Sequence, residues 1–293
     1  EVGRVVYTQL LNGRGGIECD LTVARLAEDR FLLVTGTAFG GHDLGWVRRH
    51  LPEDGSVEAR DATSREAVLG LFGPRAREIL GELSPDDLSF PYMTWREITV
   101  GNVPVRAHRV TYVGELGWEL YAPTEYGLAL FDAILEAGRP RGMVPAGYRA
   151  IDSLRLEKGY RAWGADITPE DTPLEAGLGF AVKLDAGVDF IGREALLRQR
   201  EEGVARRLRC LVLDDPRAQA LGNEPVRREG RVVARVTSGG IGYSVGRSIA
   251  YAWLPSGLDG VGERFEVEVF GEWVGAEVAA EPLWDPSGER IRA

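Results

Sequence analysis

The stretch Tyr112-Val113-Gly114-Glu115-Leu116-Gly117-Trp118-Glu119 places two glycines, two aromatic residues and two glutamates inside a run, residues 105–121, that otherwise has a strand-like pattern. Glycines within a strand pattern allow a bulge or a close approach of the backbone to a ligand. A buried carboxylate needs hydrogen-bond donors, because leaving it unpaired is costly. A flat, donor-rich heterocycle stacked on the aromatic residues would supply such donors. A bulged hairpin with solvated glutamates is the simpler alternative, and the stretch alone leaves both open.

The rest of the first two hundred residues alternates strands and helices. Period-two patterns predict strands over residues 5–11, 17–26 and 31–35, a strand pair over 57–71 turning at 61–65, and a hairpin made of 98–105 and 107–113. Helical spacing of apolar residues predicts helices over 40–51, 73–83, 125–137, 147–158 and 192–200. This succession of antiparallel hairpins and helices is typical of an α+β fold.

The predicted secondary structure of the chain changes after Gly203. Short strands are predicted over residues 208–213, 232–237, 248–254, 264–269 and 272–280, with glycine-rich turns between them. Even spacing of short strands indicates a small β-barrel or sandwich. The segment Thr237-Ser238-Gly239-Gly240 is expected to be one of the turns. We therefore expect a domain over residues 1–203, with an inserted subdomain at roughly 56–138, and a C-terminal β-barrel over 204–293.

Composition excludes several functional classes. The 293 residues are 44% hydrophobic, which suffices for a large core, and the net charge of −10 argues against a general nucleic-acid binder. Cys19 and Cys210 are the only cysteines, which suits a reducing compartment, so we expect a cytoplasmic protein, or a mitochondrial matrix protein in a eukaryote. Three histidines without clustered cysteines predict no metal site. No run is long and apolar enough to span a membrane, and no signal peptide is visible.

The start of the chain also carries an expectation. Residues 1–8 already read as a strand, without the loose polar lead that is common in soluble chains. We therefore expect a fragment of a longer protein or one subunit of an assembly.

Three segments outside the opening stretch are candidates for chemistry. Asp20 shares one face of a predicted strand with Thr22, and that face is either solvated or part of a site. Arg155 lies on a predicted helix whose polar residues could form an ordinary amphipathic face. Trp163 stands beside a glycine in a loop, where a tryptophan serves either as a lid over a pocket or as a packing anchor. No G-x-S-x-G elbow or Walker A sequence occurs, and residues 36–41 lack the glycine order of a dinucleotide loop.

Taken together, these segments resemble the folate-dependent aminomethyltransferase family, whose namesake is the T-protein of the glycine cleavage system. The segments fall in the family's order, cover nearly the whole chain, and are specific in combination. They are residues 15–21 (GGIECDL), 112–119 (YVGELGWE), 152–157 (DSLRLE), 164–169 (GADITP), 172–178 (TPLEAGL), 190–192 (FIG) and 236–239 (VTSG).

The helix motif points to a subgroup. Residues 154–164, LRLEKGYRAWG, are more similar to the C-terminal folate domains of dimethylglycine and sarcosine dehydrogenases or oxidases than to the T-protein form. The resemblance implies helices and sheets packed around a central folate pocket, followed by the barrel. It also implies tetrahydrofolate as cofactor, with FAD present only if a flavoprotein domain or subunit supplies it.

The resemblance implies a role for individual residues. Asp20 matches the catalytic aspartate beside N5 and N10 of tetrahydrofolate, where a carboxylate can orient the amine and accept its proton. Glu119 matches the glutamate that pairs with the 2-amino and N3–H edge of the pterin. Tyr112 matches the aromatic residue lining the pterin slot. Thr22, Arg155 and Trp163 are expected to complete the cofactor-binding set.

Two positions depart from the T-protein pattern. Ile151 stands where a basic residue usually precedes the helix motif, and Thr35 and Gly36 occupy the stretch where an asparagine is often found. These departures affect how the one-carbon donor is presented. A methylated amine, its iminium or formaldehyde is therefore expected in place of a protein-bound lipoyl arm.

The resulting hypothesis is a transferase that forms 5,10-methylenetetrahydrofolate from an amine-derived methylene group, as the folate domain or subunit of a dimethylglycine/sarcosine dehydrogenase-like system. One alternative is a tetrahydrofolate-dependent O- or S-demethylase of the same fold. Another is a folate-binding module without chemistry of its own.

Overall fold

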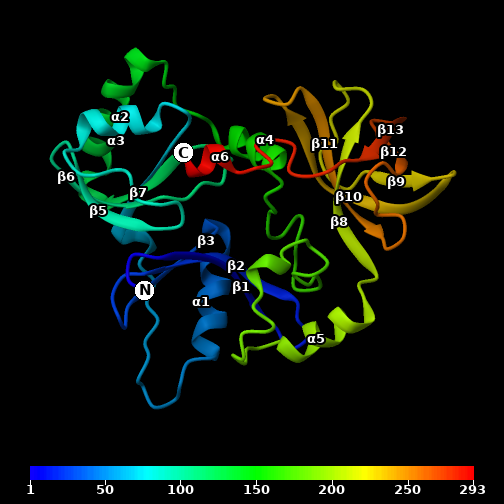
Figure 1. The fold of residues 1–293 in the computed structure, drawn as a ribbon, viewed down its shortest axis with the longest axis horizontal. Helices are drawn as coiled ribbons and strands as arrows, with labels where there is room; N and C mark the ends of the chain where they lie inside the picture. Colours follow the sequence, from blue (N-terminus) through cyan, green and yellow to red (C-terminus); the bar gives the residue numbers. More distant parts are fainter. The chain divides into compact units, whose positions relative to one another are not determined.

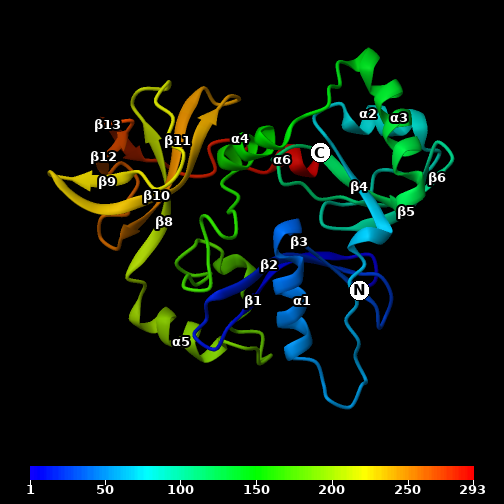
Figure 2. The same cartoon turned by 180° about the vertical axis from the view of Figure 1, so that it is seen from behind.

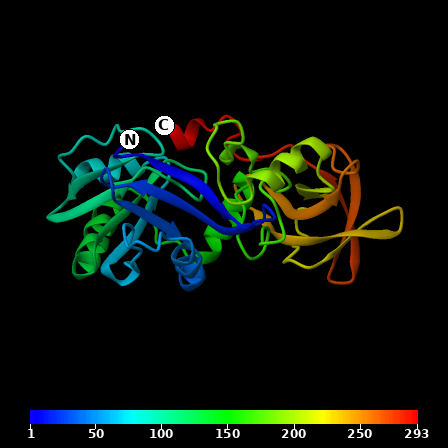
Figure 3. The same ribbon diagram turned by 90° about the horizontal axis from the view of Figure 1, so that it is seen from below.

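A computed structural model describes residues 1–293, and the chain forms two compact units. The first unit comprises Glu1–Tyr7, Leu21–Gly147 and Ser287–Ala293, so both chain ends belong to it (Figure 3). The second comprises Thr8–Asp20 and Tyr148–Pro286. The domain boundary near residue 203 and the inserted subdomain stay predictions.

An N-terminal hairpin begins the fold. Strands β1 (Val5–Leu11) and β2 (Ile17–Arg25) form a three-stranded sheet with β3 (Phe31–Thr35), and helix α1 (Gly40–Arg49) follows. All four elements were predicted from the sequence. Strand β1 begins in the first unit and continues in the second from Thr8. Strand β2 begins in the second unit and continues in the first from Leu21.

A four-stranded antiparallel sheet forms the centre of the first unit, in the order β4-β7-β6-β5 (Figure 1). Helices α2 and α3 pack against one face of this sheet, where apolar residues of the strands and helices make a single core. The bounds are β4 (Glu66–Phe72), α2 (Ala76–Leu83), β5 (Trp95–Val100), β6 (Val103–His108), β7 (Gly117–Pro123), α3 (Gly127–Gly138) and α6 (Glu289–Arg292).

Alternation along β7 separates the two faces of this sheet. Trp118 and Leu120 are fully buried in the core with the helices, whereas Glu119 and Tyr121 point to the opposite face. The sheet therefore has one apolar face under helices and one face that carries polar and aromatic side chains.

Three predictions in this unit are wrong. The hairpin of β5 and β6 turns between Val100 and Val103, five residues earlier than predicted, with Gly101 in the left-handed conformation that the tight turn requires. Residues 109–116 form the loop between β6 and β7, so the run 105–121 is not one strand.

The predicted strand over residues 57–60 is also absent. There, side chains bond locally instead: the Asp61 carboxylate accepts from the Thr63 N–H at 2.8 Å, and Arg60 Nε donates to Glu58 at 2.6 Å. Such local bonds compete with strand pairing.

The second unit contains a closed six-stranded antiparallel barrel, which confirms the predicted barrel and the α+β class (Figure 2). Its strand order is β10-β11-β8-β13-β12-β9, and its interior is filled by apolar side chains. The bounds are β8 (Arg206–Leu213), β9 (Pro225–Arg228), β10 (Arg231–Gly242), β11 (Arg247–Pro255), β12 (Arg264–Val269) and β13 (Glu272–Val278).

Strand β10 corrects one sequence prediction. Residues Thr237-Ser238-Gly239-Gly240 are not a turn but lie inside β10, where Gly239 pairs with Ala250. The neighbouring strand β9 was not predicted from the sequence. A side chain at Gly239 would meet the Ala220 carbonyl oxygen at 2.7 Å. The glycine is therefore explained by close backbone packing within a strand.

Helices α4 (Tyr148–Lys158) and α5 (Arg193–Glu202) complete the second unit. The last turn of α4 is buried on all sides, including Arg155, Glu157 and Lys158, so it is not an ordinary amphipathic surface helix. Gly159, with φ of +73°, ends it as the sequence predicted. No helix in the structure combines the length and the hydropathy needed to cross a lipid bilayer. Short 3₁₀ turns occupy Thr37–Phe39, Thr63–Arg65, Thr124–Tyr126, Arg139–Arg141 and Gly179–Ala181.

Candidate functional site

Glu119 is held on the polar face of the first unit's sheet by one side chain of its own strand. The Tyr121 hydroxyl donates to Glu119 Oε2 at 2.7 Å, and no other hydrogen bond to the carboxylate is present. Burial raises the pKa of Glu119 above its ordinary value, and the bond from Tyr121 offsets part of this rise. The same burial, with the nearby Glu119 charge, raises the pKa of Tyr121, so this hydroxyl stays a donor. Glu119 therefore keeps one oxygen available for an external donor.

A histidine packs beside this pair. The rings of His108 and Tyr121 lie 4.4 Å apart between centroids, and His108 is 1% exposed. Burial, reinforced by the Arg106 charge, lowers the pKa of His108 to about 3. His108 is consequently uncharged at neutral pH.

The neutral tautomer of His108 follows from its partner. Arg106 Nε, which can only donate, lies 3.2 Å from His108 Nε2, so Nε2 is the accepting nitrogen and Nδ1 carries the hydrogen. Arg106 is fixed in turn by Glu66, whose Oε2 accepts from Nη2 at 2.7 Å. Three neighbouring strands thus present a connected polar group on one face: Glu66 on β4, Arg106 and His108 on β6, and Glu119 and Tyr121 on β7.

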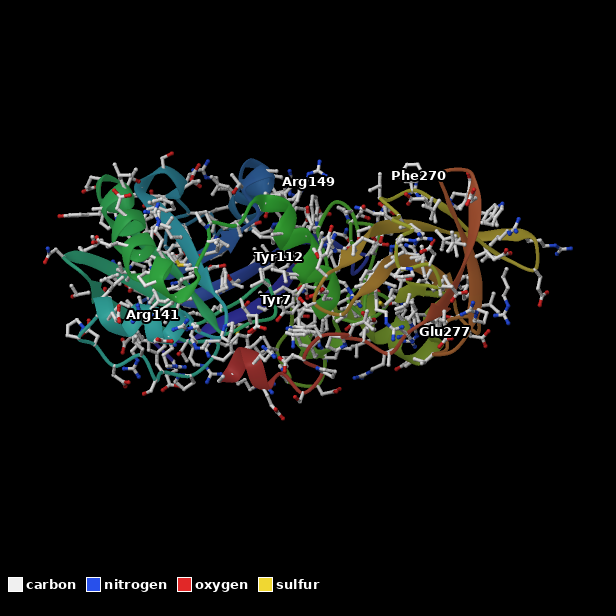
Figure 4. All side chains as sticks on the ribbon, turned by 90° about the horizontal axis from the view of Figure 1, so that it is seen from above. Tyr7, Tyr112, Arg141, Arg149, Phe270 and Glu277 are labelled. Carbon is white, nitrogen blue, oxygen red and sulfur yellow. The ribbon has the colours of Figure 1, made fainter.

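The loop between β6 and β7 carries the remaining residues of the opening stretch. Tyr112, labelled in Figure 4, is 39% exposed there. Glu115 Oε1 accepts from Arg290 Nη1 at 2.9 Å, and Gly114 has φ of +71°. The two glutamates of the stretch are therefore different: Glu115 is in a partly exposed ion pair, and Glu119 lies on the sheet face.

Asp20 lies in the second unit, on the part of β2 that belongs to it. Gln9 of the neighbouring strand β1 donates from Nε2 to Asp20 Oδ1 at 3.0 Å. Gln9 is buried, and its Oε1 atom has no hydrogen-bond partner. A buried acceptor without a partner is costly to the fold, so Gln9 is held in this place at the expense of one unmade hydrogen bond.

The glycines before Asp20 have a structural explanation. A side chain on Gly16 would meet the Pro169 carbonyl oxygen at 1.9 Å, so only glycine allows this approach. Asn12 completes the arrangement by donating to that same carbonyl at 3.0 Å and accepting from the Gly16 N–H at 3.0 Å. The neighbour that comes close to the hairpin is thus the loop after α4.

That loop also positions Trp163. The indole Nε1 donates to the Ile17 carbonyl at 2.9 Å, three residues before Asp20 on the same strand. The tryptophan is half-buried. This bond makes Trp163 an anchor between the loop and the strand that carries Asp20.

Arg155 lies in a buried polar network of the second unit. Its Nη1 atom donates to Asp166 Oδ2 at 2.6 Å, and the two side chains are 6% and 0% exposed. Asp166 also accepts from the hydroxyls of Thr237 at 2.6 Å and Ser238 at 2.5 Å. The network joins α4, the loop and β10, and so explains the Thr237-Ser238 pair without a bound anion.

The predicted site residues are divided between the two units. Asp20, Arg155 and Trp163 belong to the second unit, and Thr22, Tyr112 and Glu119 to the first. Sequence reasoning missed Tyr121, although its position two residues after Glu119 places it on the same strand face. It also missed Gln9, His108 and Asp166, each of which contacts a residue of another strand: Asp20, the Tyr121 ring and Ser238, respectively.

Comparisons with known proteins agree with this architecture. The family described as GCVT N-terminal domain matches residues 1–186, and the glycine cleavage T-protein C-terminal barrel domain matches residues 206–285. Mitochondrial dimethylglycine dehydrogenase of Homo sapiens is 40% identical over 298 residues, covering 100% of this chain and 34% of that protein. The chain thus spans about a third of that relative's length.

Two further relatives are nearer to this chain in length. An aminomethyltransferase of Symbiobacterium thermophilum is 37% identical over 289 residues, covering 97% of this chain and 77% of that protein. The crystal structure of the glycine cleavage system aminomethyltransferase T from Bartonella henselae superposes with a TM-score of 0.87 at 28% identity, covering 98% of this chain and 77% of that one. These relatives imply a transferase. The chain therefore belongs to the glycine cleavage T-protein family and contains both its N-terminal domain and its C-terminal barrel domain.

Proposed function

We propose that this chain is a tetrahydrofolate-dependent one-carbon transferase that forms 5,10-methylenetetrahydrofolate from an amine-derived methylene group. The observation that carries the proposal is Glu119, a largely buried carboxylate with a single partner on the polar face of the sheet. An aminomethyltransferase among the relatives supports the reaction class. The finer chemistry rests on the residues themselves.

The residues present fit a pterin. Its 2-amino group and N3–H form an edge of two donors, and a carboxylate is the side chain that accepts both. Tyr121 occupies one lone pair of Glu119 Oε2 and fixes the direction of the carboxylate, leaving Oε1 without a partner. The His108 ring beside Tyr121 is neutral, so it does not compete with a ligand for the Glu119 carboxylate. Tyr112 and Thr22 are proposed to line the same cofactor.

Asp20 is the proposed catalytic residue. When bound, tetrahydrofolate supplies two amine nitrogens, N5 and N10, that carry the methylene group between them. With formaldehyde as donor, two N–H bonds break, two N–C bonds form, and the carbonyl oxygen leaves as water. The Asp20 carboxylate accepts a proton from the attacking amine, as a general base does. Gln9 donates to Asp20 Oδ1 and helps to fix the direction of this carboxylate.

Arg155 and Trp163 are proposed to act on cofactor binding by positioning. Arg155 fixes the loop after α4 through Asp166, and Trp163 ties the same loop to β2 at the Ile17 carbonyl. Together they hold the strand that carries Asp20. This interpretation gives both residues a part in the site without a direct bond to folate.

The donor is proposed to come from the oxidation of a methylated amine. Dimethylglycine dehydrogenase is a relative over the whole of this chain, and the chain covers 34% of it. We infer that a flavoprotein domain or subunit oxidises the amine and supplies the iminium or formaldehyde. FAD would belong to that partner.

Product analysis tests the proposal against its alternatives. The full chain is incubated with tetrahydrofolate and formaldehyde, and the folate product is identified by mass. A rate of 5,10-methylenetetrahydrofolate formation above the uncatalysed rate supports the proposal. Formation of 5-methyltetrahydrofolate from an O- or S-methyl donor would instead assign a demethylase. Tight folate binding without any acceleration would assign a binding module.

A further inference from the structure

Strand β10 is paired along its two halves with different neighbours. Residues Arg231–Arg235 pair with β9, and the ladder with β11 begins only at Val236, opposite Ala252. On the β11 side, the backbone groups of the first half therefore have no strand partner. Figure 1 shows that the β9–β10 hairpin extends beyond the rest of the barrel. Strand β10 is therefore paired with β11 only from Val236 onward.

Strand β11 has a matching open edge. Its end, Trp253 to Pro255, pairs with β8 on one side, opposite Leu208 to Arg206, and with no strand on the β10 side. An unpaired strand edge is a template for a further strand, because its N–H and C=O groups lack partners. Two such edges face each other here.

A groove of about 520 Å³ lies between these edges. It is lined by Ala205, Arg206, Val232, Val233, Ala234, Arg235, Thr237, Trp253 and Pro255. Val232 is 63% exposed. The lining thus combines a free backbone edge with an apolar wall, which is the arrangement by which extended peptides bind to sheets.

The charge of the groove lining indicates which kind of peptide would bind there. Arg235 is exposed and makes no ion pair. In Arg206, by contrast, the guanidinium carbon lies 4.7 Å from the centroid of the Trp253 ring, and Nη2 lies 2.7 Å from Asp171 Oδ1. The uncompensated charge of the groove is therefore positive and lies at Arg235. An acidic side chain beside a free strand edge is complementary to it.

We propose that this groove binds an extended acidic segment of a partner polypeptide. The segment adds as a short strand to the edge of β10 at Val232–Arg235, places a carboxylate at Arg235 and packs an apolar side chain against Trp253. The residues that line this groove do not include those proposed for folate chemistry.

The test uses the full chain and two synthetic peptides, Ac-Glu-Val-Glu-Val-Glu-NH₂ and its lysine counterpart Ac-Lys-Val-Lys-Val-Lys-NH₂. Titration calorimetry measures affinity, and hydrogen exchange locates the bound peptide. We expect saturable binding of the acidic peptide only, with slowed exchange of the amides of Val232–Arg235. Arg235→Glu should weaken binding roughly tenfold, because it replaces an attraction by a repulsion.

Arg231 provides the matched control. It is also exposed and makes no ion pair on the same strand but does not line the groove, so Arg231→Glu should change affinity by less than a factor of about three. The proposal is overturned if neither peptide binds at millimolar concentration, if both bind alike, or if protection falls elsewhere. A dimer of the free chain that already protects Val232–Arg235 would also overturn it, since a second copy would then occupy the edge.

Discussion

The Tyr121 hydroxyl donates to Glu119 Oε2 at 2.7 Å, and this is the one hydrogen bond that the Glu119 carboxylate makes. Both residues belong to β7, two positions apart, so the sheet itself sets their direction. A largely buried carboxylate held from one side is ready to accept from the other. The pair therefore defines where a donor-rich ligand would bind.

Replacing Glu119 by Gln should weaken tetrahydrofolate binding by about 2 kcal/mol, or roughly 30-fold, because a hydrogen bond to a charged group is lost. Tyr121→Phe should cost about 1 kcal/mol, since it removes only the bond that directs the carboxylate. Titration with a fluorescence readout measures both. Glu115→Gln is the control: Glu115 is engaged by Arg290, so its loss should leave affinity unchanged. Equal losses in Glu119→Gln and Glu115→Gln would contradict the assignment.

His108 should make stability depend on pH between about 6.5 and 3. Its folded pKa of about 3 lies below the ordinary value, so over this window the unfolded chain binds a proton that the folded chain does not. The neutral ring makes its full contribution to the free energy of unfolding above pH 6.5. This contribution decreases as the pH is lowered, by up to about 1.4 kcal/mol per pH unit.

The variant His108→Gln isolates this contribution. Its amide oxygen can still accept from Arg106, but it does not titrate. Glu66, Arg106, Glu119 and Tyr121, the ionisable neighbours, are present in both proteins, so their effects largely cancel in the difference. Urea unfolding at several pH values should show the wild-type advantage shrinking toward pH 4. A difference that is constant with pH would refute the burial of a neutral histidine.

The Arg155–Asp166 pair should be among the most sensitive positions of the second unit. Removing one partner of a buried pair leaves an uncompensated charge, and Arg155→Met should destabilise the fold by about 3 to 5 kcal/mol. The exposed pair Arg14–Glu170, at 73% and 74% exposure, offers a contrast: Arg14→Met should cost less than about 1 kcal/mol. Chemical denaturation measures both. Similar small losses would show that the network does not hold the loop.

Gly16 should tolerate no side chain. Gly16→Ala places a methyl group 1.9 Å from the Pro169 carbonyl oxygen, so the backbone must shift, at a cost of about 3 kcal/mol. Gly13→Ala, in the same turn, meets nothing within 4 Å and should be close to neutral. Thermal unfolding compares the two. A neutral Gly16→Ala would mean that the loop does not pack on the hairpin in solution.

Local patterns predicted most elements because their causes are local. The N-terminal hairpin, helix α4 and the barrel strands β8, β11 and β12 follow from apolar period and from turn residues such as Gly159. The strand expected at residues 57–60 is absent: Arg60 pairs with Glu58 within the segment, and Asp61 turns the chain just after it by accepting from the Thr63 N–H. The turn expected at residues 237–240 is wrong because Gly239 instead permits close packing of the strand against Ala220, which no local pattern contains.

The residues of the candidate site likewise differ in whether the sequence alone could predict them. Asp20 and Glu119 could be singled out because a carboxylate in a strand needs an explanation, and the family resemblance supplied one. Tyr121 was within reach of the alternation rule. Gln9, His108 and Asp166 were not, because Asp20, the Tyr121 ring and the Ser238 hydroxyl, which they respectively contact, lie on other strands, where only the fold brings them together.

The central claim is tested most directly by Asp20→Ala in the full chain, with tetrahydrofolate affinity and the catalysed rate of 5,10-methylenetetrahydrofolate formation measured on the same preparation. The account predicts that affinity stays within a few-fold of wild type while the catalysed rate falls by about a hundredfold, the typical contribution of a general base. Glu119→Gln should show the opposite pattern, with affinity lost first. Product formation by Asp20→Ala at the wild-type rate would contradict the account.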